Sequence, residues 1–382
     1  MKIQAMITAQ YDKFPKNKMM RVLILCTSQF GYHVDTYYYC KYGREMFEIT
    51  YLGFEGTRPM IFMSGVKIRH VSHKGNLLYK WLRWLWGALI ESRKKYDIVF
   101  LKYFPGCSIV RIFCPHRTFI LDIRTASISK YKLVRDLLDF VLRCESKLFK
   151  YITIISESLA HKLIMPINKV HVLPLGADII KTKPKIFDNL DLLYVGTFSG
   201  RELEKTIIGF DKFYRENKNE ISMSYTLIGD GYRGERNNLQ SLVTELGLEN
   251  VIKLPGFIHH EGLGTYWEKS NVGVSFVPIN IIYDAQPPTK TFEYILAGMV
   301  VIATNTTENR RVINKINGVL IKDTANDFYL GLKEIYDNRT KYNADSIRQT
   351  CVNYQWDNIV KKYLCTYLKA MLTNSNQQSY NK

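Results

Sequence analysis

The chain has 382 residues, a length that predicts two domains of about 100–200 residues each. Apolar residues make up 46% and charged residues 23%, which excludes wholesale disorder and a collagen-like chain. Seven cysteines without a CxxC pair argue against a disulfide framework or a cysteine zinc site and predict a reducing compartment. A transmembrane helix is not expected, because no run of about 18 uncharged apolar residues is present. Residues 1–20 lack the apolar segment of a signal peptide.

The net charge of +18 is unevenly distributed. Residues 1–180 hold 28 Lys and Arg against 13 Asp and Glu, whereas residues 181–382 hold 25 against 22. This asymmetry predicts that the first half faces an anionic partner, which would be lipid headgroups, a phosphorylated substrate or nucleic acid.

The first half of the chain alternates strand-like and helix-like segments. A continuous apolar run predicts a buried strand at 21–26, and strand-like runs follow at 47–52, 67–71, 98–101, 118–121 and 151–155. Helical patterns lie between several of them, at 33–44, 76–95, 130–149 and 157–163. This alternation is typical of α/β units on a parallel sheet.

The second half repeats this organisation after a polar, proline-containing stretch at 174–190, which we interpret as an interdomain linker. Strands are predicted at 191–195, 224–228, 251–254, 272–276 and 300–303. Helices are predicted at 201–216, 236–246, 261–269 and 289–297, and a final amphipathic helix at 356–372 precedes a polar tail.

Two glycine turns in the second half follow predicted strands. Gly196 to Arg201 opens a predicted helix, where free N–H groups and the arginine favour an anion such as phosphate. Gly229 and Gly231 flank Asp230 after the next strand. Turns at the carboxyl ends of parallel strands line the crevice of open α/β sheets. Tight turns without a ligand are the alternative at both positions.

The stretch from Gln286 to Tyr294 is the most informative. Two prolines precede a predicted helix, and Thr289 is the expected N-cap. Lys290 and Glu293 lie three residues apart on the first turn, where both can meet a bound nucleotide. A capped helix with a local Lys–Glu pair is the alternative.

The ordered combination of these stretches resembles the donor-binding domain of retaining GT-B glycosyltransferases, the family-4 or glycogen-synthase-like group. The resemblance rests on residues 192–196, 227–231, 254–257 and 292–303, and on 172–178 as the family's crossing between domains. It implies an α/β GT-B fold in which two Rossmann-like domains face a cleft. Residues 1–180 would form the acceptor domain, 181–355 the nucleotide-sugar domain, and 356–382 a helix crossing back to the first domain, with the tail.

The resemblance also implies roles for single residues. Glu293 matches the second glutamate of the family's E-x7-E motif, which bonds the ribose, whereas the first glutamate falls at Ala285, between Asp284 and Gln286. Lys290 is then expected to contribute charge to the pyrophosphate or the sugar.

Further matches follow by position. Arg201 aligns with the lysine that neutralises the diphosphate, and Thr197 replaces the family's arginine after the strand. Gly31 matches the glycine loop that approaches the diphosphate from the first domain, and Asp122 with Arg124 falls near the acceptor. The expected catalytic set is Arg201, Lys290, Glu293 and Asp122. The expected donor-binding set is Gly31, Gly196, Gly229, Gly231, Thr289 and Glu293.

The resemblance therefore implies a hexosyl- or related glycosyltransferase that moves a sugar, with retention, from a UDP- or GDP-linked donor to a saccharide or lipid-linked acceptor. The donor is a substrate, so no cofactor is expected. Cations and backbone donors around the leaving diphosphate suit this chemistry. Surface-polysaccharide assembly at the cytoplasmic face of the cell membrane is the expected context.

A sugar-nucleotide 2-epimerase of the same fold and a non-catalytic nucleotide-sugar-binding partner remain alternatives. Nucleic-acid binding ranks last, because no recognition motif is present, so no nucleic-acid partner is expected.

The segment 76–95 is a second candidate functional region. Leu78, Leu82, Leu85 and Leu89 form one helical stripe, which Trp81, Trp84 and Ala88 widen, and Lys and Arg residues flank it. This pattern predicts peripheral contact with an anionic membrane, with an ordinary domain helix as the alternative.

No metal site is expected, because the pairs His259-His260 and His70/His73 lack further ligands at zinc spacing. The three tyrosines at 37–39 are expected to pack on one face of the first helix, with base stacking as the alternative.

Overall fold

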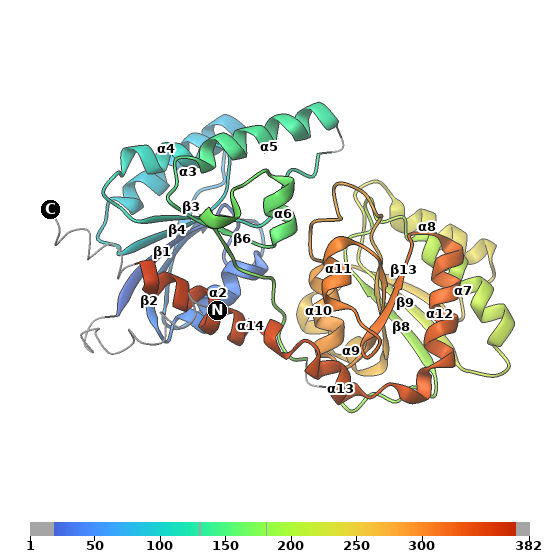
Figure 1. The fold of residues 1–382 in the computed structure, drawn as a ribbon. Coiled ribbons are helices and arrows are strands. Elements are labelled where there is room, and N and C mark those ends of the chain that lie inside the picture. Colours follow the sequence, from blue (N-terminus) through green and yellow to red (C-terminus); the bar gives the residue numbers. More distant parts are fainter. Residues whose placement is uncertain (1–18, 130, 181, 372–382) are drawn as a thin grey trace. The chain divides into compact units, whose positions relative to one another are not determined.

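The computed structural model describes residues 19–129, 131–180 and 182–371, which fall into two compact units (Figure 1). Unit 2 is Leu175–Gln355, and unit 1 combines the chain up to Pro174 with the segment from Trp356 onward. The border after Pro174 lies inside the crossing stretch 172–178, a few residues before the expected border at 180. The predictions for residues 1–18 and for the tail after Met371 lie outside the described residues.

Unit 1 is built on a seven-stranded parallel sheet with the order β3-β2-β1-β4-β5-β6-β7. Its strands are β1 (Met20–Leu25), β2 (Phe47–Phe54), β3 (Val66–Val71), β4 (Ile98–Lys102), β5 (Phe119–Ile123), β6 (Tyr151–Ile154) and β7 (Val170–Val172). Strands β1, β4 and β5 are almost wholly buried, as expected for apolar strands covered on both faces.

Helices cover both faces of this sheet (Figure 1). They are α2 (Val34–Gly43), α3 (Leu77–Ser92), α4 (Cys107–Phe113), α5 (Lys132–Ser146) and α6 (Glu157–Lys162), with a 3-10 turn at Ile167–Lys169. Helices α3, α4 and α5 lie on one side, and α4 contacts both of the others. The side chains of Asn76 and Ser156 cap α3 and α6 by accepting from the N–H groups of Tyr79 and Leu159. Helix α4 and strand β7 were not predicted.

The C-terminal segment packs on the other side, against α2. It begins as α14 (Trp356–Asn358), continues as a π-helix over Ile359–Cys365 and returns to α-helix up to residue 371. The buried Trp356 ring stacks on Tyr38 at 5.1 Å between centroids and meets Tyr39 edge-on at 5.9 Å. Two of the three tyrosines singled out in the sequence thus anchor this segment.

Unit 2 has a six-stranded parallel sheet with the order β10-β9-β8-β11-β12-β13. Its strands are β8 (Leu190–Val195), β9 (Met223–Ile228), β10 (Ile252–Gly256), β11 (Val272–Ser275), β12 (Val300–Thr304) and β13 (Gly318–Ile321). Its helices are α7 (Glu204–Asn217), α8 (Glu235–Glu245), α9 (Gly264–Lys269), α10 (Thr289–Leu296), α11 (Thr307–Val312), α12 (Ala325–Asp337) and α13 (Ala344–Gln349), with 3-10 turns at His260–Leu263, Arg339–Lys341 and Val352–Tyr354. Strand β13 and helices α11 to α13 were not predicted.

One predicted helix start and one predicted N-cap are wrong. Helix α7 begins at Glu204 rather than at Arg201, because Gly200 and Glu202 both take positive φ values, 68° and 54°, which no α-helix contains. Helix α10 includes Thr289 as its first residue, and Pro288 occupies the N-cap without a side-chain bond. Thr289 therefore does not cap the helix.

Candidate functional site

The two glycine turns of unit 2 lie against each other at the carboxyl ends of β8 and β9. The N–H of Gly196 donates to the carbonyl of Ile228, and the N–H of Phe198 donates to the carbonyl of Asp230. Gly229 has φ 146°, and a Cβ there would lie 1.8 Å from the carbonyl oxygen of Gly196. Gly229 is therefore required by the close approach of the two turns, whether or not a ligand is bound.

Arg201 lies in the first of these turns, ahead of α7. Its guanidinium lies over the ring of Tyr283, 4.3 Å from the centroid, and beside the Tyr194 hydroxyl. Tyr194 donates a 2.7 Å hydrogen bond to the Thr197 carbonyl. The Nη1 atom of Arg201 is buried and has no hydrogen-bond partner among the described residues. A buried, uncompensated guanidinium nitrogen is costly unless an anion meets it, so the turn is suited to a phosphate oxygen.

Lys290 and Glu293 are paired on the first turn of α10. The ammonium of Lys290 donates to Oε2 of Glu293, and it lies 5.9 Å from the centre of the Trp267 ring. Both side chains are only partly exposed. The pair is thus positioned at the same carboxyl edge of the sheet as Arg201, where ligands of open α/β sheets bind.

Ala285 stands where the family's first glutamate is expected, and two polar residues flank it. Ala285 is buried. Asp284 cannot replace the glutamate, because its carboxylate accepts from the N–H and the hydroxyl of Thr307 at 2.8 and 2.7 Å and so caps α11. The Nε2 atom of Gln286 is buried without a partner in the part of the chain that the structure describes. This amide is the available polar group beside Ala285.

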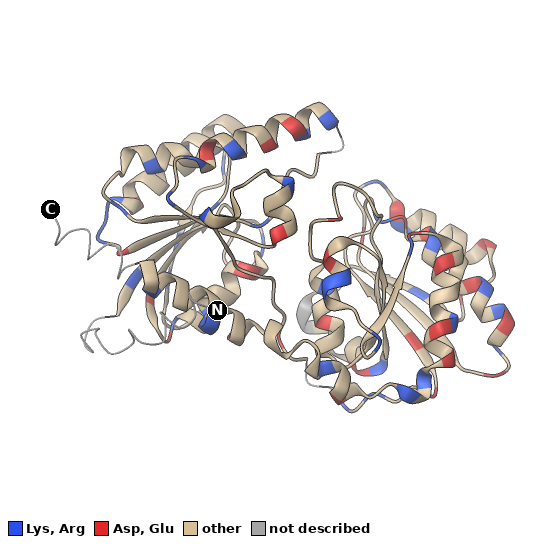
Figure 2. Ribbon diagram, viewed as in Figure 1, with Lys and Arg blue, Asp and Glu red and all other residues tan. Residues whose placement is uncertain are grey.

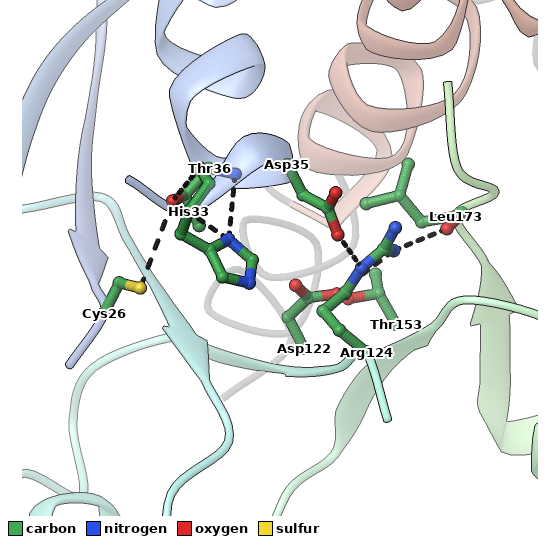
Figure 3. A network of polar contacts seen from close by, with 8 residues as sticks. All are labelled: Cys26, His33, Asp35, Thr36, Asp122, Arg124, Thr153 and Leu173. Carbon is green, nitrogen blue, oxygen red and sulfur yellow. Dashed lines mark hydrogen bonds and ion pairs between the residues drawn. The ribbon is translucent and has the colours of Figure 1, made fainter. Parts of the chain in front are cut away.

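The candidate residues of unit 1 surround the carboxyl end of β5 (Figure 3). Asp122 is 0% exposed, and its Oδ1 accepts a 2.7 Å bond from the Thr153 hydroxyl. Arg124 donates to Asp35 at 2.5 Å and to the Leu173 carbonyl at 2.6 Å. Arg124 Nη1 also lies 3.9 Å from Asp122 Oδ1. The result is a buried network that ties β5 to α2, β6 and the end of β7.

Burial and charge set the protonation of this network. Burial raises the pKa of Asp122 to about 6, against the opposing effects of Arg124 and Thr153. His33, the N-cap of α2, accepts from the N–H of Thr36 through Nδ1. Burial, helped by Lys102, lowers the pKa of His33 to about 4, so this imidazole is neutral at pH 7.

Gly31 lies in the turn between β1 and α2, with φ 89°. A Cβ at this position would meet Ile61 Cδ1 at 2.5 Å. The positive φ of the turn itself favours glycine, and the expected contact of Gly31 with a diphosphate stays a prediction.

Several of these residues were not predicted. Asp35 and His33 form an HxD pattern two residues after Gly31, which marks a polar helix start and could have been noticed. Thr153 and Tyr283 carry no sequence signal, because their contacts arise only from the pairing of strands and the packing of loops. Gln286 was noted as a neighbour of Ala285, but its buried, unpartnered Nε2 could not be foreseen.

An open cavity of about 670 Å³ lies at the opposite end of the unit 2 sheet, near the amino ends of its strands. It is lined by Asp191, Ser224, Lys253 and Lys269, among others, near the amino ends of β8 and β9. It contains no residue of the expected site. In the described ranges, no group of three His, Cys, Asp or Glu side chains is arranged to hold a metal ion.

Comparisons with known proteins define the class. The model of the family described as "Glycosyl transferases group 1" matches residues 189–338. No curated protein sequence matches the chain. Among solved structures, sucrose-phosphate synthase from Thermosynechococcus elongatus is 12% identical with a TM-score of 0.71, and the match covers 93% of this chain and 100% of that one.

Two further structures have the same fold. HepE from Anabaena, solved in complex with UDP, is 13% identical with a TM-score of 0.68, over 92% of this chain and 100% of that one. WaaB, a lipopolysaccharide outer core galactosyltransferase, is 16% identical with a TM-score of 0.66, over 92% and 100%. The fold is thus GT-B. Unit 2 carries a group 1 glycosyltransferase domain, and the chain is a transferase.

Proposed function

We propose that the chain transfers a sugar, with retention of anomeric configuration, from a nucleoside-diphosphate sugar to a saccharide or lipid-linked acceptor. The observation that carries this proposal is the position of Arg201 and of the Lys290–Glu293 pair. All three lie at the carboxyl edge of the sheet, inside the stretch that matches group 1 glycosyltransferases. The family resemblance supplies the expectation of retention.

The proposed reaction is a substitution at the anomeric carbon. The bond from that carbon to the diphosphate oxygen breaks, and a bond to the acceptor oxygen forms on the same face. The acceptor proton passes to the leaving diphosphate. Negative charge develops on the diphosphate, so the cations of Arg201 and Lys290 stabilise the transition state. Glu293 would hold the ribose, which provides binding energy remote from the reacting bond.

The donor is proposed to be UDP-linked, with GDP as the alternative. HepE, which has the same fold, was solved with UDP, and this supports the choice. We assign Gln286 to a hydroxyl of the donor sugar, because its buried, unpartnered Nε2 adjoins the position of the family's first glutamate. An amide in place of a carboxylate would change the preferred sugar without removing the site.

The acceptor side is proposed to belong to surface-polysaccharide assembly at the inner face of the cell membrane. The excess of cations in residues 1–180 and the description of WaaB as a lipopolysaccharide enzyme support this context. The described part of the chain contains no helix with the length and apolarity needed to cross a bilayer. A membrane contact through the described residues would therefore be peripheral.

The test replaces Glu293 and Gln286 and follows turnover of UDP-sugars. Glu293→Ala is expected to lower kcat/KM for the donor by about tenfold or more, because the ribose contact and the partner of Lys290 are both lost. Gln286→Ala is expected to change the ranking of donor sugars. Asp345→Ala, which removes the acid of another i,i+3 pair with Arg348, is the matched control and should leave turnover unchanged.

The products distinguish the alternatives. Retention predicts that the new linkage has the same anomeric configuration as the donor, as read by NMR. A free epimer released without an acceptor would instead identify a 2-epimerase. Binding of the donor without turnover would identify a non-catalytic partner. Unchanged kinetics in a folded Glu293→Ala variant would contradict the assignment of the site.

A further inference from the structure

The outer side of the α3–α4–α5 layer of unit 1 exposes large apolar side chains. On α3, Trp86 is 63% exposed; on α4, Phe113 is 60% exposed; and on α5, Leu133 is 83% exposed. Because α4 contacts both α3 and α5, these side chains belong to one layer rather than to separate parts of the unit. Large exposed apolar side chains that gather on one helix layer are typical of an interaction site.

Helix α3 is apolar on two sides. Its inner side buries Trp84, Leu85 and Ala88 against the unit. The predicted stripe is therefore only partly right: Leu85 is buried and Leu89 half-buried, whereas Leu78 and Leu82 are exposed.

The outward stripe of α3 was not predicted. It runs through Tyr79, Leu82, Trp86 and Ile90, which are all exposed and lie at intervals of three to four residues. A helix with apolar residues all round is normally buried, so this outer stripe calls for a second apolar environment.

Helix α5 is held mainly by its C-terminal end. Its buried residues are Leu142, Glu145 and Ser146. Glu145 accepts from the N–H groups of Gly106 and Ser108 at 3.0 and 3.1 Å and so ties α5 to the start of α4. The fixed end gives α5 a definite orientation on the unit.

The rest of α5 carries a second apolar stripe. Its exposed apolar residues are Leu133, Val134, Leu137, Leu138 and Phe140. Their spacing of three and four residues places most of them on one side of the helix, while Lys132, Arg135, Asp136 and Asp139 alternate around the other. Helix α5 is thus amphipathic, and the described residues leave its apolar side exposed.

Cations accompany this apolar surface. Residues 77–95 contain five Lys and Arg against one acid, 107–117 two against none, and 131–147 four against three. Two of these four acidic side chains have partners within the unit. Glu91 binds Lys94 and Arg69, and Glu145 caps α4. Figure 2 shows blue segments along this helix layer, with red bands on α5 as well.

We propose that the α3–α4–α5 layer docks on an anionic lipid bilayer. The apolar stripes of α3 and α5 would enter the boundary between headgroups and acyl chains. The flanking Lys and Arg would meet lipid phosphates. Trp86 and Tyr79 are residue types favoured at this boundary, because each has an apolar ring and a polar atom. The excess of positive charge favours an anionic bilayer over a second copy of this equally basic chain.

The test measures co-sedimentation of the full chain with phosphatidylcholine vesicles, with and without phosphatidylglycerol. Wild type is expected to bind the anionic vesicles, and added salt should weaken this binding. The double variants Leu82→Ser with Trp86→Ser and Leu133→Ser with Leu137→Ser are each expected to reduce it by about tenfold, since each removes two bulky apolar groups from the boundary.

A matched control keeps the result specific. Ile316→Ser with Leu330→Ser removes two exposed apolar residues of unit 2 and should leave vesicle binding unchanged. Circular dichroism and UDP binding of every variant show whether the fold is intact. UDP binding also separates a failure of the donor site from a failure of docking.

Three results would overturn the proposal. They are the absence of wild-type binding to anionic vesicles, equal binding by folded variants of the layer, and equal binding to uncharged vesicles. A wild-type dimer that becomes monomeric in these variants, without vesicle binding, would show instead that the layer joins two copies of the chain.

Discussion

Asp122 shows how burial sets the chemistry of one carboxyl group. It is fully buried, Arg124 lies 3.9 Å away, and Thr153 donates to it, yet Arg124 is held more closely by Asp35. The cost of desolvation therefore exceeds the attraction of the guanidinium, and the pKa of Asp122 rises to about 6. This geometry makes Asp122 a positioning residue that orders Arg124 and the ends of β5 and β6.

This interpretation predicts a pH dependence of stability. The folded state holds the Asp122 proton more tightly than the unfolded chain, so its stabilising contribution is complete at low pH and is lost as the pH rises through 6. Relative to Asp122→Asn, the wild-type free energy of unfolding should fall by about 2 kcal/mol between pH 4 and pH 7. Urea unfolding of both proteins across this range measures it. If the free energy of unfolding of wild type relative to Asp122→Asn stays constant or rises with pH, the raised pKa is contradicted.

At the scale of elements, the C-terminal segment completes unit 1. Trp356 fills the space between Tyr38 and Tyr39 of α2, and Tyr367 stacks on His171 of β7 with ring centres 4.2 Å apart. Burial lowers the pKa of His171 to about 4, so the stacked imidazole is neutral at pH 7. The segment thus makes ring contacts with residues far from it in sequence, on α2 and on β7.

Removal of the central ring tests this role. Trp356→Ala is expected to lower the free energy of unfolding by about 3–5 kcal/mol, because a fully buried indole leaves a cavity among aromatic rings. Tyr363→Ala on the same segment removes a ring that is 38% exposed and should cost about 1 kcal/mol or less. Thermal or urea unfolding compares the two. Equal losses would show that the segment does not depend on the Trp356 contact.

The elements also show how far the sequence could be interpreted. The strands β1, β4, β8, β9 and β12 were predicted closely. For β1, β4 and β12 the reason is a continuous apolar run, which is typical of a strand covered on both faces. The start of α7 was missed, because the positive φ of Glu202 is set by packing and not by its residue type. The outward stripe of α3 was missed as well, since periodicity shows that two sides of a helix are apolar but not which side is buried.

The candidate site divides in the same way. The glycine turns and the Lys290–Glu293 pair could be predicted from local patterns. The stacking of Arg201 on Tyr283 and the unpartnered Nε2 of Gln286 could not, because both depend on the path of the long loop between β11 and α10.

At the scale of the whole molecule, the proposed donor site and the proposed bilayer contact lie on different units. Unit 2 carries the residues proposed to bind the donor and is nearly neutral in sequence, while the basic first half carries the apolar helix layer. A lipid-linked acceptor and a bilayer contact on the same unit are mutually consistent, since both place the acceptor near the membrane surface. The proposed function nevertheless depends on unit 2, because it requires that this unit bind a nucleoside diphosphate.

The most direct measurement is therefore the thermal unfolding of the purified chain with UDP, GDP, ADP and CMP and their common sugar conjugates. Binding to the folded state raises Tm, so one nucleoside diphosphate should give a clear increase. Arg201→Ala should abolish the increase without changing Tm in the absence of nucleotide by more than a few degrees. An unchanged Tm with every nucleotide, in a sample that unfolds cooperatively, would contradict the assignment of a donor site to unit 2.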